Sequence, residues 1–185
     1  MAYRRGFTIV EIAVVLVIMT ILLVLGVASY TSSQGNARDK ERQADAENIT
    51  RALERFYTNG YDDTADSTSP RMYRGSYPTI SSAAKSNFLT TYLADLDDAS
   101  RQFSFGTMNF RIDDPGATTQ VDVPADQTRI GNATGTNTIT YQPMAWDSVN
   151  NYWITCRGQM ECRRFKLYYR TEKDSVLKTI ESTNQ

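Results

Sequence analysis

The chain opens with a long, nearly unbroken apolar segment. From Ile12 to Ala28 only Thr20 and Gly26 interrupt the run of apolar residues. Read as a helix at about 1.5 Å per residue, positions 7–30 extend over about 36 Å, which exceeds the roughly 30 Å hydrocarbon core of a bilayer. The pattern therefore predicts one membrane-spanning helix at this end of the chain.

The apolar run gives way to a charged stretch with helical periodicity between Asn36 and Tyr57. Apolar residues recur there at intervals of three and four: Ile49, Ala52, Leu53, Phe56 and Tyr57. This spacing predicts an amphipathic continuation of the same helix, ended by Asn59-Gly60-Tyr61. The alternative is a separate soluble helix that follows a hinge at Gln34 and Gly35.

Beyond this helix, short apolar runs alternate with turn-rich segments. A Tyr77-Pro78 turn precedes a short predicted helix at 83–97, and a polar loop is expected at 117–137. The predicted strands lie at 103–105 and 110–112 as a pair, and at 138–142, 152–156, 165–171 and 176–180. The chain is therefore predicted to have an α+β fold, with a long N-terminal helix packed on a C-terminal antiparallel sheet.

Composition narrows the classes of function. The 185 residues contain 41% hydrophobic and 22% charged side chains, as globular proteins do, and the formal net charge is −1. Histidine is absent, which removes the commonest general base and metal ligand. We predict no catalytic residue, no metal site, no cofactor and no enzyme activity.

Cys156 and Cys162 are the two cysteines of the chain. They are close in sequence and follow an apolar segment that directs them out of the cytoplasm, so we interpret them as one disulfide. The alternative is a pair of reduced, buried thiols.

Three simple interpretations of the N-terminus are available, and each leaves a feature of the apolar stretch unexplained. One such feature is Glu11, which lies within that stretch. A secretory signal peptide would have a shorter apolar region. A twin-arginine signal fits Arg4, Arg5 and Phe7 but not the strongly apolar run after them. A plain signal anchor explains the length and the cytoplasmic arginines but not an acidic residue in the membrane, which calls for a partner.

The residues Arg-Arg-Gly-Phe-Thr-Ile-Val-Glu-Ile at 4–12 resemble the class III leader of type IV pilins and type II secretion pseudopilins. The resemblance is strong over 4–30. It implies a pilin-like fold, cleavage by prepilin peptidase between Gly6 and Phe7, and methylation of the new amino group on Phe7. It also implies that this amine pairs with Glu11, within a subunit or between neighbours.

The resemblance further implies three regions and a function. Residues 1–6 form a leader that is removed, 7–57 a transmembrane and assembly helix, and 58–185 an extracytoplasmic head. The subunit is held in the inner membrane as a single-pass precursor surrounded by lipid. An assembly ATPase and a platform protein then polymerise it with copies of itself into an extracellular pilus for adhesion, twitching motility or DNA uptake.

Two other functions stay open at this point. A type II secretion pseudopilin would form a short, piston-like fibre instead of a surface filament. A single-span, membrane-anchored exported protein would not polymerise at all.

Two kinds of charged cluster are candidates for ligand binding. Acidic residues at 62–66 and 95–98 have carboxylates that suit calcium, but they fit no EF-hand spacing, and we interpret them as solvated loops. A basic cluster is interleaved with aromatic residues, as in proteins that bind DNA or anionic surface polymers, but we favour the alternative, a solvated strand face. Its members are Arg157, Arg163, Arg164, Lys166 and Arg170.

Overall fold

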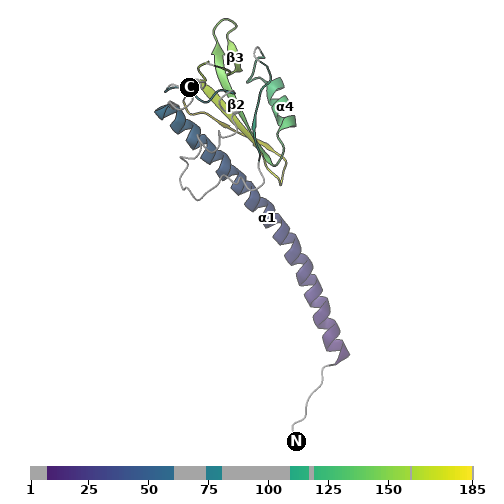
Figure 1. Cartoon of the computed structure of the whole chain (residues 1–185). Helices are drawn as coiled ribbons and strands as arrows, with labels where there is room; N and C mark the ends of the chain where they lie inside the picture. Colours follow the sequence, from purple (N-terminus) through teal and green to yellow (C-terminus); the bar gives the residue numbers. More distant parts are fainter. Residues whose placement is uncertain (1–7, 61–73, 81–108, 117–118, 159, 185) are drawn as a thin grey trace.

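A computed structural model describes residues 8–60, 74–80, 109–116, 119–158 and 160–184 of the chain. A single long helix, α1, carries a small head at its C-terminal half, and its N-terminal half projects away from the head (Figure 1). The predicted short helix at 83–97 and the predicted strand at 103–105 lie outside the described residues, as do both acidic clusters.

Helix α1 extends over Ile9–Asn59 without a break and contains 51 residues, which corresponds to about 76 Å. Thr8 caps its start, because the Thr8 hydroxyl accepts a hydrogen bond of 3.2 Å from the Glu11 N–H. Gly60 ends it at φ 69°, a left-handed conformation that glycine adopts without strain. The helix is therefore continuous, and the alternative of a hinge at Gln34 and Gly35 is wrong.

Five strands form one sheet in the head: β1 (Asn109–Ile112), β2 (Thr138–Asp147), β3 (Tyr152–Thr155), β4 (Arg164–Arg170) and β5 (Leu177–Glu181). The order is β1-β2-β4-β5, and β3 forms a hairpin with β2. The predicted α+β fold is confirmed, but the sheet is mixed, because β1 and β2 pair in parallel from Asn109↔Thr138 to Ile112↔Tyr141. The prediction of a wholly antiparallel sheet is wrong in this pair.

A short helix, α4 (Pro124–Ala133), occupies part of the region predicted as a polar loop. Pro124 stands at the first helical position, where its fixed φ suits a helix and its missing N–H leaves no bond unmade. The helix buries Ile130 and Asp126. It lies in the connection between the parallel strands β1 and β2, which need such a crossover.

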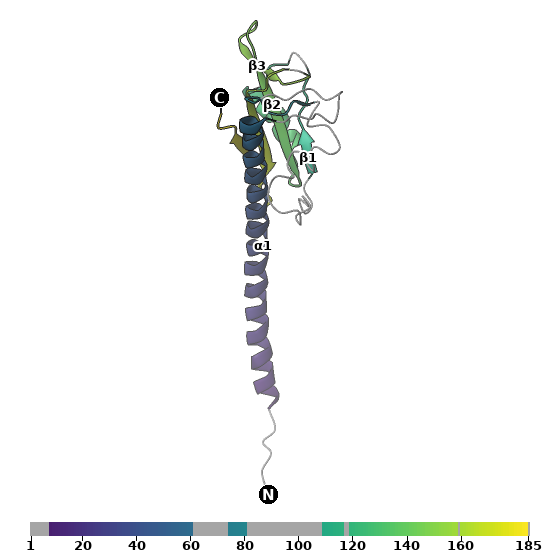
Figure 2. The ribbon, with the colours of Figure 1, turned by 60° about the vertical axis from the view of Figure 1, so that its left-hand side comes forward.

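The core of the head lies between the C-terminal half of α1 and one face of the sheet (Figure 2). Ala46, Ile49 and Leu53 of α1 are at most 1% exposed. They share a cluster with residues from β2 and β4, namely Ile139, Tyr141, Ala145, Phe165, Leu167 and Tyr169. The predicted apolar stripe of α1 is thus the surface that holds the head, whereas α4 covers the opposite face of the sheet.

Candidate functional site

The N-terminal half of α1 has no partner in the described part of the chain. Residues Ile9–Val27 form a 19-residue window of mean hydropathy 3.0, and none of it is buried. At about 1.5 Å per residue the window covers about 28 Å. This half is long and apolar enough to cross a membrane, and exposing so much apolar surface to water would be strongly unfavourable.

Glu11 stands in the first turn of this apolar half, and its side chain is exposed. It is the only charged residue between Ile9 and Ala37. An unpaired carboxylate is expensive in hydrocarbon, and no cation on the neighbouring turns of α1 can neutralise it. Gly6 and Phe7 lie outside the described residues, so their roles in cleavage and methylation remain predictions.

A group of ionic contacts attaches the head to α1 near the point where the helix emerges from the head. We call this group the lower clasp. Oδ1 of Asp39 accepts a hydrogen bond of 2.6 Å from the Glu172 N–H, and Oδ2 accepts one of 3.3 Å from the Lys173 N–H. Arg42 bridges the two carboxylates, at 3.0 Å to Asp39 and 2.8 Å to Glu172. Arg38 adds a second contact of 2.8 Å to Glu172.

The lower clasp holds both of its carboxylates ionised. Burial by itself would raise the pKa of Asp39, but the two backbone donors and Arg42 outweigh it, and the net pKa is lowered. The hydrogen bond from Arg42 is the main reason why the pKa of Glu172 is lowered. The β4–β5 turn is thereby fixed to one turn of α1.

Glu54 forms a second attachment, here called the upper clasp, near the C-terminal end of α1. Its carboxylate accepts hydrogen bonds of 2.9 Å from the Tyr77 hydroxyl, 2.7 Å from the Thr183 N–H and 2.6 Å from Asn184 Nδ2. Burial and the bond to Glu54 raise the pKa of Tyr77. The two clasps are 15 residues apart, about 22 Å along the helix, and they hold both ends of the head on α1.

Cys156 and Cys162 form a disulfide with both residues fully buried. Backbone bonds tie the segment at 76–80 to it, from Tyr77 N–H to the Cys162 carbonyl at 2.8 Å and from Ile80 N–H to the Cys156 carbonyl at 3.1 Å. The hydroxyl of Ser76 also accepts a bond of 3.0 Å from the Cys162 N–H. The disulfide loop therefore fastens the Tyr77-Pro78 turn to the sheet.

The basic cluster does not form an open cationic face. Lys166 is 5% exposed and contacts the carboxylates of Asp122 and Glu181, and Arg164 lies near the same two groups. Arg157 pairs with Asp114 and Arg163 with Glu161, while Arg170 donates to the carbonyls of Thr134, Gly131 and Ser175. Because carboxylates and carbonyls of the head pair with these cations, most of the cluster is part of the head's structure. The solvated face that we favoured describes the exposed Arg163 but is wrong for Lys166.

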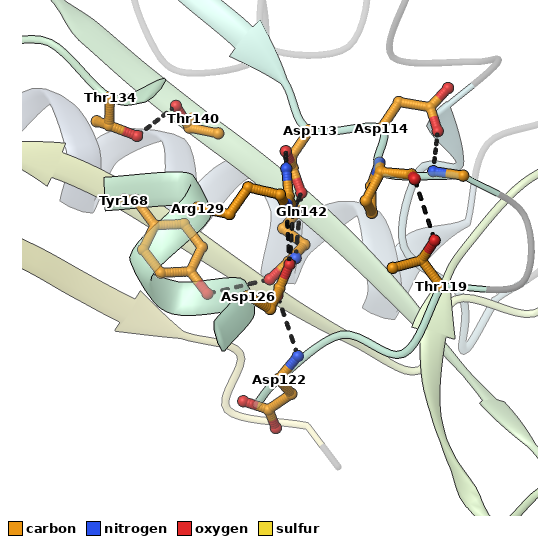
Figure 3. Close-up of polar contacts among 12 residues, drawn as sticks. Asp113, Asp114, Thr119, Asp122, Asp126, Arg129, Thr134, Thr140, Gln142 and Tyr168 are labelled. Carbon is orange, nitrogen blue, oxygen red and sulfur yellow. Dashed lines mark hydrogen bonds and ion pairs between the residues drawn. The ribbon is translucent and has the colours of Figure 1, made fainter. Parts of the chain in front are cut away.

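A buried polar network on the α4 side of the sheet was not anticipated from the sequence. Asp113 and Asp126 point toward one guanidinium, that of Arg129, and toward the amide of Gln142 (Figure 3). The Tyr168 hydroxyl donates to Gln142 Oε1 at 3.0 Å. These residues come from four separate segments, and only Asp126 and Arg129, three positions apart on α4, are related by their spacing in the sequence.

Residues 1–27 match the family model described as the prokaryotic N-terminal methylation motif. The chain carries a class III prepilin leader. Comparisons with curated proteins and with solved structures find no match. The leader supports a type IV pilin-like or pseudopilin protein, which is made as a membrane-anchored precursor, processed by prepilin peptidase and assembled into pilus-like polymers.

Proposed function

We propose that this chain is the structural subunit of a type IV pilus, an extracellular filament used for adhesion, twitching motility or DNA uptake. The observation that carries the proposal is the N-terminal half of α1, fully exposed and apolar, with one carboxylate in its first turn. Residues 1–6 are the leader, 7–57 the anchor and assembly helix, and 58–185 the head. The proposal assigns the chain no catalytic step.

The apolar half of α1 would occupy two environments of similar polarity. In the membrane the apolar half of α1 contacts lipid, and in a filament it contacts the same segment of other copies. Moving from one to the other changes the exposure of apolar surface to water very little. The segment can therefore be stored in the inner membrane and extracted by an assembly ATPase and a platform protein.

Glu11 sets the axial register of this packing. Cleavage after Gly6 creates an amine on Phe7, four residues before Glu11, and methylation leaves that amine cationic. An ion pair between Phe7 of one copy and Glu11 of another removes the unpaired carboxylate from the filament core, where low polarity strengthens the attraction. Copies that lack this pair would leave a charge buried and unpaired.

The first experiment tests this register with Glu11→Ala, produced in the cells that make the protein. We expect normal membrane insertion and leader cleavage but loss of sheared filaments in electron micrographs. Val15→Ala, which shortens an apolar side chain in the same segment, is the matched control and should retain filaments. Filaments of wild-type abundance from Glu11→Ala would contradict the proposal and favour a tethered protein that does not polymerise.

Intact-mass and N-terminal analysis of the mature protein gives a second test. The expected product lacks residues 1–6 and starts at a methylated Phe7. A mature chain that starts at Ser29, or one that keeps Met1, would contradict the assignment of the leader.

A pseudopilin of type II secretion is the second candidate, because the same leader supports it. It would assemble into a short periplasmic fibre. Mass spectrometry of sheared surface material separates the two functions, since abundant long filaments made of this chain favour the pilus subunit.

A further inference from the structure

Lys166 presents a buried amine to two carboxylates of the head. The residue lies within β4 and is 5% exposed. Its Nζ atom contacts Oδ1 of Asp122 and lies 2.9 Å from Oε1 of Glu181. Lysine is almost never buried to this degree unless it is paired, and here one amine meets two acids. A nucleophile, an acid that it could attack and a second carboxylate therefore meet at one atom.

The backbone delivers both acids to this amine. Glu181 is the cross-strand partner of Lys166 in the β4–β5 pair. Asp122 adopts φ 65°, a left-handed conformation that is uncommon for a residue with a side chain. It is held there by its N–H, which donates a hydrogen bond of 3.2 Å to Oδ2 of Asp126 (Figure 3). The two carboxylates thus reach Lys166 from fixed positions on separate segments.

Arg164 completes the group by holding the two oxygens that Lys166 does not contact. Its Nη1 atom lies 3.7 Å from Oδ2 of Asp122, and its Nη2 atom lies 3.6 Å from Oε2 of Glu181. The guanidinium itself lies 5.0 Å from the ring centroid of Trp153. Each carboxylate therefore directs one oxygen toward the amine and the other toward a fixed cation.

Lys166 is charged before any reaction. Burial by itself would lower the pKa of Lys166, but hydrogen bonds to Asp122 and Glu181 outweigh it, and the net pKa is raised. In a buried site, the cost of desolvating two opposite charges is close to the gain from their attraction. Transfer of one proton from Nζ to Oδ1 of Asp122 removes both charges. It leaves a neutral amine against a carboxylic acid, which is the form that can react.

We propose that Lys166 and Asp122 join covalently through an isopeptide bond between Nζ and Cγ, with Glu181 as the proton carrier. The neutral amine attacks Cγ of Asp122, and the negative charge that develops on Oδ2 faces Arg164. Glu181 takes a proton from the nitrogen and delivers it to the hydroxyl at Oδ1. The bond from Cγ to Oδ1 then breaks, one water leaves, and Oδ2 becomes the carbonyl oxygen of the amide. No oxidant, reductant or further reactant is consumed.

The fold makes this condensation feasible because it holds the two groups in contact. An amine and an acid fixed in this way react as if their concentration were higher by several orders of magnitude. The bond would close a loop between positions 44 residues apart, which contains α4, β2, β3 and the disulfide. A cross-link over so long a loop strongly restricts the unfolded chain. Because the bond lies within one chain, it does not depend on the proposed function.

Intact-mass analysis of the folded, full-length chain purified in detergent tests the bond. The wild-type chain should be lighter by one water than the mass calculated for the same chain with its disulfide formed. Trypsin should release residues 112–129 and 165–170 as one branched peptide, because the amide blocks cleavage after Lys166. Folded wild-type protein that has the full calculated mass, and gives these regions as separate peptides, would overturn the proposal.

Three variants assign the roles of the residues. Lys166→Arg keeps the positive charge and Glu181→Gln keeps the size of the side chain, and both should have the full calculated mass. Lys178→Arg, which changes an exposed lysine of β5, is the matched control and should still be lighter by one water. A loss of water that persists in Lys166→Arg would place it at another residue and overturn the cross-link. A branched peptide from Glu181→Gln would overturn the role given to Glu181.

Discussion

Arg129 lies between two carboxylates that the fold carries into the interior of the head. Asp113 is completely buried and Asp126 is 4% exposed, whereas the side chain of Arg129 is 38% exposed. The hydrogen bonds that Arg129 donates to Asp113 are the main reason why the pKa of Arg129 is raised, so the guanidinium stays charged. A buried ion pair adds little net stability, but removing one partner leaves an uncompensated charge.

We predict that Arg129→Met destabilises the head by about 3 kcal/mol, at the low end for a broken buried pair because water reaches the guanidinium. Chemical unfolding of the detergent-solubilised chain measures the change. Gln127→Met, on the exposed side of α4, is the matched control and should have little effect. Adding Asp113→Asn to Arg129→Met should recover part of the loss, and an unchanged midpoint in Arg129→Met would contradict the role given to the network.

The head is attached to α1 by an apolar core that lies between two polar clasps. The lower clasp depends on ionised Asp39 and Glu172, whose ordinary pKa values are 3.8 and 4.5. Both pKa values are lowered in the folded protein, so their contribution to stability is fully present above the ordinary values. It is lost as the pH falls through the folded pKa values.

We therefore predict that Asp39→Asn lowers the melting temperature of the head at pH 7, and that the difference from wild type shrinks below about pH 4. Asp174→Asn removes one negative charge from the β4–β5 turn that Asp39 contacts, without breaking a described contact with α1, and should show no such convergence. Melting curves followed by circular dichroism from pH 7 to pH 3 measure both. A difference that stays constant over this range would contradict the ionic basis of the lower clasp.

The disulfide loop also makes a measurable contribution to the stability of the head. Replacing Cys156 and Cys162 together by Ser should cost about 2 kcal/mol, because only a short loop is released and the loop-closure entropy is small. Unfolding in denaturant, with reduced wild type as the control, measures the loss. Equal midpoints for oxidised wild type and the double variant would contradict this prediction.

An element of the fold can be predicted from the sequence when the residues that determine it are close together in the chain. Helix α1 and the strands at 152–155, 164–170 and 177–181 follow from periodicity and turn residues, and the predictions match them closely. Strand β2 was predicted at 138–142, but it continues to Asp147. Helix α4 was missed because it buries only one apolar residue, Ile130, together with Asp126. The parallel pairing of β1 was missed because strand direction depends on the crossover that contains α4.

The residues of the candidate site differ in the same way, because some give a local signal in the sequence and others meet only in the fold. Glu11 stands out in the sequence because it is one carboxylate in an apolar run, a local signal. The clasps could not be predicted, since Asp39 and Glu172 are 133 residues apart and Glu54 meets Thr183 and Asn184 only in the fold. The interpretation of the basic cluster failed for the same reason, because Asp122 and Glu181 come from other segments to neutralise Lys166.

The two halves of α1 have separate roles. Residues 9–27 are exposed throughout, and the first side chain along α1 that forms an ion pair with the head, among the described residues, is Arg38. The head should therefore fold without the apolar half.

We predict that a chain starting at Ser33 is soluble and monomeric, and that it melts within a few degrees of the full-length protein in detergent. Sedimentation and thermal unfolding measure these properties. Its control is a chain starting at Glu41, which lacks Arg38 and Asp39 and should melt at a lower temperature. Aggregation of the chain that starts at Ser33 would contradict the separation of the two halves.

The spacing of the two clasps has a mechanical consequence. Tension applied to the head of an anchored subunit enters α1 at two points about 22 Å apart, and the sheet bridges them. Force directed along the helix then shears several ion pairs and hydrogen bonds simultaneously instead of peeling them one after another. The turns of α1 between Asp39 and Glu54 are shielded from stretching, so under load the helix should extend first in the bare segment below Arg38.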